Sequence, residues 1–121
     1  MTKKKKYTHL DIKTPTGRAL YAVFKKLDGG RAWCKNAWAK NSVGVGVVPW
    51  NDGAVRFCVN GALNVTLNAN TSLYHSVSAA LTYTIPPKVI GRIHYNDNPR
   101  TTWQTIRKWF GRAIKRAEGW S

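Results

Sequence analysis

The chain has two cysteines, and they lie in similar local frames, RAWCKNAW over residues 31–38 and VRFCVNGA over residues 55–62. In each frame an aromatic residue precedes the cysteine and an asparagine follows two residues later. Such a pair can form a disulfide, bind a metal, supply a nucleophile or fill two packed helix faces. These four alternatives have different requirements, which the rest of the sequence can be tested against.

Metal binding has little support from the spacing. Structural zinc sites usually take their ligands from close pairs such as Cys-x₂₋₄-Cys. Here each potential ligand stands alone, many residues from the next. We therefore expect no metal and no cofactor. The potential ligands are Cys34, Cys58, His9, His75 and His94.

A nucleophilic role has little support either. Cys58 falls about six residues into a predicted helix that begins at Asp52, past the first turn where the helix dipole lowers a thiol pKa. Cys34 and Cys58 both fall on apolar stripes, and free cysteine is among the most buried residue types. We interpret them as packing residues of two short helices, with Ala37 and Gly61 allowing close approach. A cysteine paired with a spatially adjacent histidine remains the enzymatic alternative.

Acid–base chemistry has few candidates. The pair Asn96-Asp97 precedes Pro99 and predicts an Asx-type turn that leads into the last helix. A catalytic Asp97 is the alternative, although nothing pairs with it in the sequence. No phosphate loop, dinucleotide fingerprint or hydrolase elbow is present, so we expect a non-enzymatic protein. The carboxylates are Asp11, Asp28, Asp52, Asp97 and Glu118.

Charge is the strongest global signal. The 121 residues include 20 Lys+Arg against 5 Asp+Glu, a formal net charge of +15. Residues 1–40 and 86–121 hold all but one of the basic residues, and the stretch between them is nearly neutral and apolar. Such a distribution favours a polyanionic partner for the two ends and a core or apolar interface for the middle.

The elements expected to position these residues are helices. Thr14 and Pro15 suit the start of a helix whose apolar stripe ends before Gly29-Gly30. A shorter helix is predicted over 31–40, another over 72–85, and a strongly amphipathic one from Thr101 or Thr102. The segments 41–51 and 88–95 are read as connectors in which short strands remain possible. We expect one all-α domain of about five helices over residues 14–121, after a basic N-terminal arm over residues 1–13.

The segment from Asp52 to Asn68 fits two structures. Asn60-Gly61 between apolar runs is a hairpin signal, but the hairpin register mixes polar and apolar residues on both faces. Helical spacing from Val55 to Thr66 gives a cleaner apolar face, so we predict a helix. Gly61 then marks a close contact with another helix.

Three segments resemble an uncharacterised family of small helical proteins from bacteria and their phages. They are RAWCKNAWAK, VRFCVNGAL and HYNDNPRTTWQTIRKWFGRAIKRAE, within a match over roughly residues 19–117. The family has aromatic-Cys helices and an Asn-Asp-x-Pro-x-Thr turn before its C-terminal helix. The resemblance implies a mostly helical fold and supports the helix at Val55. It implies no activity, and the charge of +15 departs from members richer in acidic residues.

The leading functional prediction is a small phage or mobile-element accessory protein that binds DNA or RNA through phosphate contacts. The alternative is a protein-interaction module that inhibits an acidic host protein, and the third is a small hydrolase using Cys58 or Asp97. No apolar run approaches the ~20 residues that span a bilayer, and no secretory signal is seen. We therefore expect a cytoplasmic protein with free thiols and no membrane contact. The predicted phosphate-binding residues are Lys3, Lys4, Lys5, Lys6, Lys108, Arg112, Lys115 and Arg116.

Overall fold

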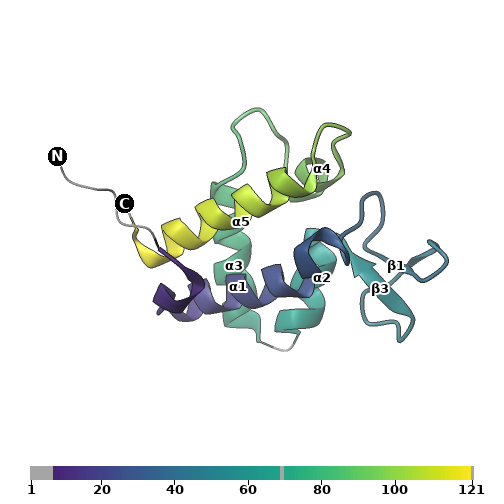
Figure 1. Ribbon diagram of the computed structural model, residues 1–121, viewed down its shortest axis with the longest axis horizontal. Helices are drawn as coiled ribbons and strands as arrows, with labels where there is room; N and C mark the ends of the chain where they lie inside the picture. The colour runs from purple at the N-terminus through teal and green to yellow at the C-terminus, as the bar shows by residue number, and fades with distance from the viewer. Residues whose placement is uncertain (1–6, 69, 121) are drawn as a thin grey trace.

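The computed structural model describes residues 7–68 and 70–120, which form a helical body with a small sheet at one end (Figure 1). Lys3–Lys6, in the expected N-terminal arm, lie outside the described residues. The elements in chain order are η1 His9–Asp11, α1 Pro15–Lys26, η2 Asp28–Gly30, β1 Ala39–Asn41, β2 Gly46–Val47, β3 Ala54–Phe57, α2 Val59–Leu67, α3 Thr71–Tyr83, α4 Arg92–Asp97 and α5 Trp103–Glu118.

The expectation of an all-α domain is wrong. Residues 7–68 and 70–120 form five α-helices and a three-stranded antiparallel sheet of order β2-β1-β3, so the fold is mixed. Ala39 pairs with Val47 on one side and with Phe57 on the other. Ala39 and Phe57 are both buried, so this register turns one face of the sheet toward the core.

The predicted helix over 31–40 does not form. The backbone of Ala32 and Cys34 instead pairs with β3, because Phe57 N donates to Ala32 O at 2.8 Å and Cys34 N donates to Phe57 O at 3.0 Å. Asn36 has φ of 62°, in the left-handed region that ends any regular helix and that asparagine tolerates. The apolar spacing in this segment therefore comes from a loop pressed against a strand.

The segment around Asn60-Gly61 is helical, as predicted, but the helix begins later. Residues Ala54–Phe57 form a strand, and α2 begins at Val59 with Cys58 as its N-cap. A Cβ on Gly61 would lie 2.1 Å from the carbonyl oxygen of Trp38. The close approach predicted at Gly61 is therefore real, but its partner is the loop at Trp38 and not a second helix.

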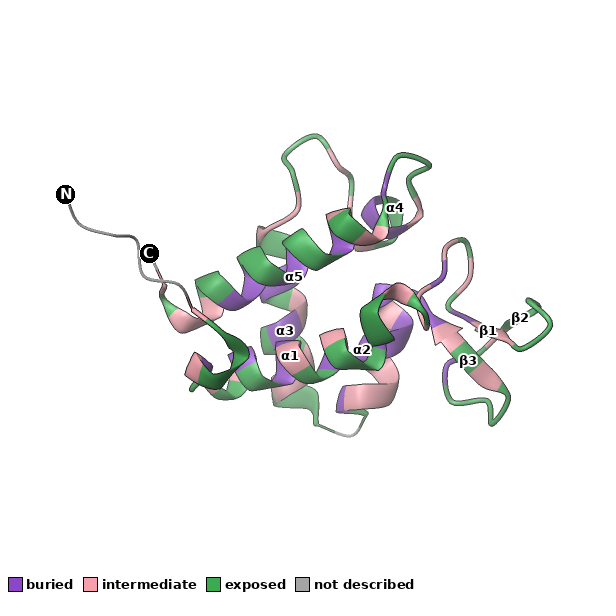
Figure 2. Cartoon of the chain, viewed as in Figure 1, coloured by how far each residue is buried: buried purple, intermediate pink, exposed green. Residues whose placement is uncertain are grey.

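The helical body is built on the elements that the sequence predicted best. Thr14 caps α1, Thr102 caps α5, and α3 covers most of the predicted helix over 72–85. α1 packs against α2, α3 and α5, and α3 also packs against α5. Buried faces turn inward along these helices (Figure 2). The largest fully buried side chains are Trp109, Phe110, Leu20, Leu27, Leu63, Leu81 and Ile106.

The two ends of the described chain meet. The rings of Tyr7 and Trp120 stack with centroids 4.3 Å apart. The Glu118 carboxylate, near the end of α5, accepts hydrogen bonds from the Lys13 N–H at 2.6 Å and from the N–H and hydroxyl of Thr14. Within the described ranges, no helix combines the length and apolar character needed to cross a membrane.

Candidate nucleic-acid interface and a pocket beside α4

α5 carries the cationic face that the sequence predicted. The Thr102 hydroxyl accepts from the N–H of Thr105 at 3.3 Å, and the Thr105 hydroxyl accepts from the N–H of Thr102 at 3.1 Å. Gly119, with φ of 68°, ends the helix. Because the apolar side is buried against α1 and α3, the opposite side faces solvent.

Five cationic side chains of α5 are exposed on this outward side. Between side chains of residues 7–68 and 70–120 there is one ion pair, Arg31 with Asp28 at 3.1 Å. The charges on α5 are therefore not neutralised by any carboxylate in the described part of the chain. We call this set the α5 cationic face: Arg107, Lys108, Arg112, Lys115 and Arg116.

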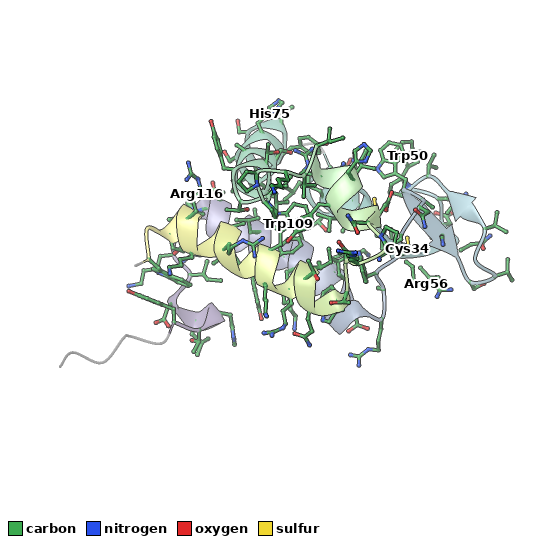
Figure 3. The ribbon with its side chains drawn as sticks, turned by 90° about the horizontal axis from the view of Figure 1, so that it is seen from above. Cys34, Trp50, Arg56, His75, Trp109 and Arg116 are labelled. Atoms are coloured by element: carbon green, nitrogen blue, oxygen red, sulfur yellow. The ribbon has the colours of Figure 1, made fainter. Side chains whose placement is uncertain are left out.

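Two of these side chains also support the fold. Arg112 donates to the carbonyl oxygen of Thr84 at 3.1 and 3.3 Å and to the Tyr95 hydroxyl at 3.3 Å. The Arg116 guanidinium lies 4.6 Å from the ring centre of Tyr83 and toward the opposite end of the molecule from Cys34 (Figure 3). Both arginines sit at the C-terminal end of α3, where the helix dipole favours cations.

Lys108 and Lys115 differ from these arginines. Neither ammonium group makes a hydrogen bond, ion pair or ring contact with the described residues. They are seven residues apart, so two helical turns place them on the same side, about 10 Å apart along the axis. They are therefore the members of the α5 cationic face best placed to meet an external anion without a cost to the fold.

A pocket of about 400 Å³, lined by both polar and apolar side chains, lies beside α4, toward the sheet. It opens between the loop at residues 36–38, the first turns of α2, one residue of α3, and α4. We call it the α4 pocket. Its lining residues are Asn36, Ala37, Trp38, Cys58, Asn60, Asn64, Tyr74, Arg92, Ile93, Asn96 and Asp97.

Asn96 holds the wall of this pocket together. Its side chain is 1% exposed and uses all four of its hydrogen-bonding positions. Oδ1 accepts from the Trp33 indole N–H at 2.8 Å and from the N–H of Val59 at 3.1 Å. Nδ2 donates to the carbonyl oxygen of Cys34 at 3.1 Å and to the Asp97 carboxylate at 2.8 Å. One side chain thus joins α4, the start of α2 and the loop before β1.

This arrangement corrects the predicted role of Asn96-Asp97. The Asx-type turn before the last helix is made by Asn98, whose Oδ1 accepts from the N–H of Arg100 at 2.9 Å. Asp97 Oδ1 instead accepts from the N–H of Asn36 at 2.9 Å, which fixes the loop at the pocket rim. The pair therefore makes long-range contacts where a local turn was expected.

The opposite charge in the pocket belongs to Arg92. Its Nε donates to Asn60 Oδ1 at 2.9 Å, and its Nη1 donates to the Thr82 hydroxyl at 2.8 Å and to the carbonyl oxygen of Ser78 at 3.4 Å. Arg92 thereby ties α4 to α2 and α3. Its Nη2 has no partner among the described residues, and both hydrogen bonds of the Asp97 carboxylate go to Oδ1.

Both cysteines are free and buried, which confirms their predicted burial. The predicted helix stripes are wrong, because Cys34 lies in the loop before β1 and Cys58 is the N-cap of α2, its Sγ accepting from the N–H of Gly61 at 3.2 Å. Burial, followed by the neighbouring Cys58, raises the pKa of the Cys34 thiol to about 11. Burial also raises the pKa of Cys58, against the effect of the Gly61 and Asn60 N–H groups. Both thiols are therefore protonated near neutral pH.

The histidines do not join the cysteines. His9 stacks on Tyr21 with ring centroids 5.3 Å apart, and His75 meets Tyr74 edge-on. In the part of the chain that the structure describes, no three His, Cys, Asp or Glu residues gather closely enough to hold a metal ion. None of the described residues that line the α4 pocket is a histidine.

Several residues of the α4 pocket were not predicted as site residues from the sequence. Trp38, the α2 residues Asn60 and Asn64, and Arg92 come from three segments that are at least 20 residues apart in the chain. Nothing in the local sequence around an asparagine or arginine on a helix indicates that its side chain lines a pocket. The one usable signal was the repeated spacing of asparagine after each cysteine, since Asn36 and Asn60 both line the pocket.

Comparison of the chain with models of protein families, with curated proteins and with solved structures found no match.

Proposed function

We propose that this protein binds DNA or RNA by phosphate contacts from the α5 cationic face together with Lys3–Lys6. The observation that carries the proposal is the set of exposed α5 cations with no carboxylate partner among the described residues. Unpaired cations on one face attract the phosphate backbone and release its counterions on binding. The aromatic residues of α5 face inward, so the contacts supply affinity and orientation and not base readout.

The test is a titration of the double variant Lys108→Gln/Lys115→Gln against duplex DNA, single-stranded DNA and RNA over a range of salt concentrations. On duplex DNA, each lost phosphate contact reduces the slope of log K against log salt by about 0.9, so the pair reduces it by about 1.8. Different sequences lose affinity about equally. Stability stays within about 0.5 kcal/mol of the parent, because both lysines are exposed and unpaired.

The matched control is Lys25→Gln/Lys88→Gln, which removes the same charge from exposed positions on α1 and on the connector before α4. It leaves the slope unchanged if α5 makes the contacts. An equal reduction of the slope in the control variant would mean that net charge alone accounts for binding, and it would contradict the role of α5. Absence of binding to all three nucleic acids at low salt contradicts the proposal as a whole.

A second candidate function is the protein-interaction module, and the sheet favours it. Exposed apolar side chains lie on the strands and in the turns between them, including Trp50 at 64% and Val43 at 79% exposure, and contiguous apolar surface of this kind marks protein interfaces. Lys40 and Arg56 are paired across β1 and β3, where like charges oppose each other and an acidic partner would relieve them. Salt-sensitive capture of an acidic protein, lost on Arg56→Gln but kept on Lys108→Gln, would favour this function over nucleic-acid binding.

The hydrolase alternative gains no support from Cys58. Its cysteine lies in the α4 pocket, but the raised pKa of Cys58 keeps the thiol protonated. No histidine of the described chain lines the pocket as a base.

A further inference from the structure

The α4 pocket has the size of a small-molecule site. Its volume of about 400 Å³ falls in the range of ligand pockets, about 300–1,000 Å³. Its walls come from four separate segments that Asn96 and Arg92 hold together by the hydrogen bonds described above. The pocket is therefore held in shape before any ligand enters.

The charges of this pocket do not select an ion. Nε and Nη1 of Arg92 already donate to Asn60, Ser78 and Thr82, and Oδ1 of Asp97 already accepts from two N–H groups, which leaves Arg92 Nη2 and Asp97 Oδ2 free among the described residues. One charge of each sign lines the pocket, so no net charge draws an anion or a cation into it. An uncharged polar ligand fits this lining better than a phosphate or a metal ion.

The groups left free in the pocket are mainly amides. Asn60 uses Oδ1 to accept from Arg92, which leaves its Nδ2 without a partner among the described residues. Asn64 uses Nδ2 to donate to the carbonyl oxygen of Asn60 at 3.1 Å, which leaves its Oδ1 likewise. The Asn36 side chain makes no hydrogen bond within the described chain. Neighbouring donors and acceptors of this kind match the edge of a heterocycle that alternates the two.

Aromatic and apolar surface lies next to these amides. Trp38 is 42% exposed and lines the pocket, and its carbonyl oxygen is fixed by the N–H of Cys58 at 3.1 Å. The half-buried ring of Tyr74 and the exposed side chain of Ile93 line it as well. A planar ring can stack on such surfaces, which contributes about 1–3 kcal/mol for a base on an aromatic side chain.

We propose that the α4 pocket binds one nucleobase, with its ring against Trp38 and its edge on the amides of Asn60 and Asn64. Nucleobases are uncharged and planar, and their edges carry adjacent donors and acceptors that asparagine pairs with. The base has two possible sources, a free nucleoside or an unstacked base of a bound strand. The first stands independently of the proposed function, and the second rests on it.

The experiment follows backbone amide signals by NMR while adenosine, inosine, cytidine and uridine are each added to about 10 mM, enough to reveal millimolar affinity. Inosine replaces the less soluble guanosine, with which it shares O6, N1–H and N7 but not the 2-amino group. We expect shifts centred on residues 36–38, 60–64 and 92–97 for at least one nucleoside. Absence of shifts at these amides with all four nucleosides overturns the proposal for free ligands.

Two variants identify the contacts. Trp38→Ala removes the stacking surface and weakens nucleoside binding by about 5- to 150-fold. Asn64→Leu removes a free amide edge at similar size and weakens binding about tenfold. The control Tyr83→Ala removes a more exposed aromatic ring that does not line the pocket, and it leaves the affinity unchanged. Equal weakening in all three variants, or none in the first two, contradicts the assignment.

A short single strand and the same strand with one abasic position distinguish the sources. If the base comes from a strand, the intact strand shifts the pocket amides, and the abasic strand at the bound position does not. Lys108→Gln/Lys115→Gln then weakens strand binding but not nucleoside binding, so failure of the α5 face and failure of the pocket are separately visible. If the strand binds without shifting the pocket amides while a nucleoside does shift them, the pocket binds free nucleosides. If neither the strand nor any nucleoside shifts the pocket amides, the proposal is wrong.

Discussion

Replacing Asn96 with alanine tests the central contact of the pocket wall. The change removes four hydrogen bonds, two accepted by Oδ1 and two donated by Nδ2. It leaves the N–H of Val59, the Trp33 indole N–H and the carbonyl oxygen of Cys34 without their partner. Asp97 is only half-buried, so water can replace the bond that its carboxylate loses.

The expected loss follows from the three groups that remain buried or half-buried. Each unsatisfied group costs about 1–3 kcal/mol, less where water enters the space left by the side chain. We therefore expect Asn96→Ala to lower the free energy of unfolding by about 4 kcal/mol. A chain of this size has about 6–18 kcal/mol in total, so the variant still folds but is much less stable.

Urea unfolding followed by tryptophan fluorescence measures the change. With a slope of about 2 kcal/mol per molar urea, the midpoint falls by about 2 M. The matched control is Asn98→Ala, two residues away, whose exposed side chain accepts one bond from Arg100. It costs less than about 1 kcal/mol, as most surface changes do. Equal midpoints for the two variants would refute the reasoning.

The near-isosteric change Asn96→Asp adds a pH dependence. The new carboxyl is buried beside Asp97 and faces the carbonyl oxygen of Cys34, so its pKa in the folded state lies above that in the unfolded state. The destabilisation is therefore full at neutral pH and decreases as the pH falls toward the unfolded value of about 4. The measurement is the difference in unfolding free energy between Asn96→Asp and the parent. If this difference is the same at pH 7 and at pH 4, the new carboxyl is not buried beside Asp97.

Gly61→Ala lowers stability by about 1–3 kcal/mol, because the added Cβ meets the fixed carbonyl oxygen of Trp38. Gly111→Ala, whose Cβ has no atom within 4 Å, raises stability by up to about 1 kcal/mol through helix propensity. Thermal unfolding of both variants checks that the two changes have opposite signs. For Glu118, burial alone would raise the pKa, but hydrogen bonds from the α1 cap lower it by more. Its contribution is present above about pH 4.3 and is lost as the pH falls through the lower folded-state pKa, so in urea titrations Glu118→Gln is less stable than the parent at pH 7, and the difference disappears below that folded-state pKa. Both cysteine thiols react with a disulfide reagent at pH 7 far more slowly than in urea-unfolded protein, and rapid labelling of the folded chain would contradict their burial.

The sequence predicted best where local signals and packing agree. α5 has a cap, a periodic apolar face over four turns and a terminal glycine, and each points to the same helix. Residues 31–40 have a similar apolar spacing but no cap and no terminal glycine, and there the hydrogen bonds to β3 determine the backbone conformation. Val55 and Phe57 satisfy a strand as well as a helix, so the start of α2 was not determined by periodicity.

The candidate site was predicted only in part for a related reason. The cations of α5 follow from helical spacing alone, so their shared face was predictable. The hydrogen bonds of Asn96 reach 37 to 63 residues back along the chain. In sequence the same asparagine has only local neighbours, which is why it was interpreted as part of a turn.

The stacking of Tyr7 on Trp120 has a practical consequence for how this chain can be rebuilt. Because the two rings lie 4.3 Å apart, residues 7 and 120 leave the molecule at the same corner, away from the sheet (Figure 1). A short glycine-rich linker would join them, and new ends could be opened at the exposed turn of residues 42–44. Such a circular permutant keeps the helical body intact, and a fluorophore or fusion partner attached at residue 7 or 120 stays clear of the α4 pocket.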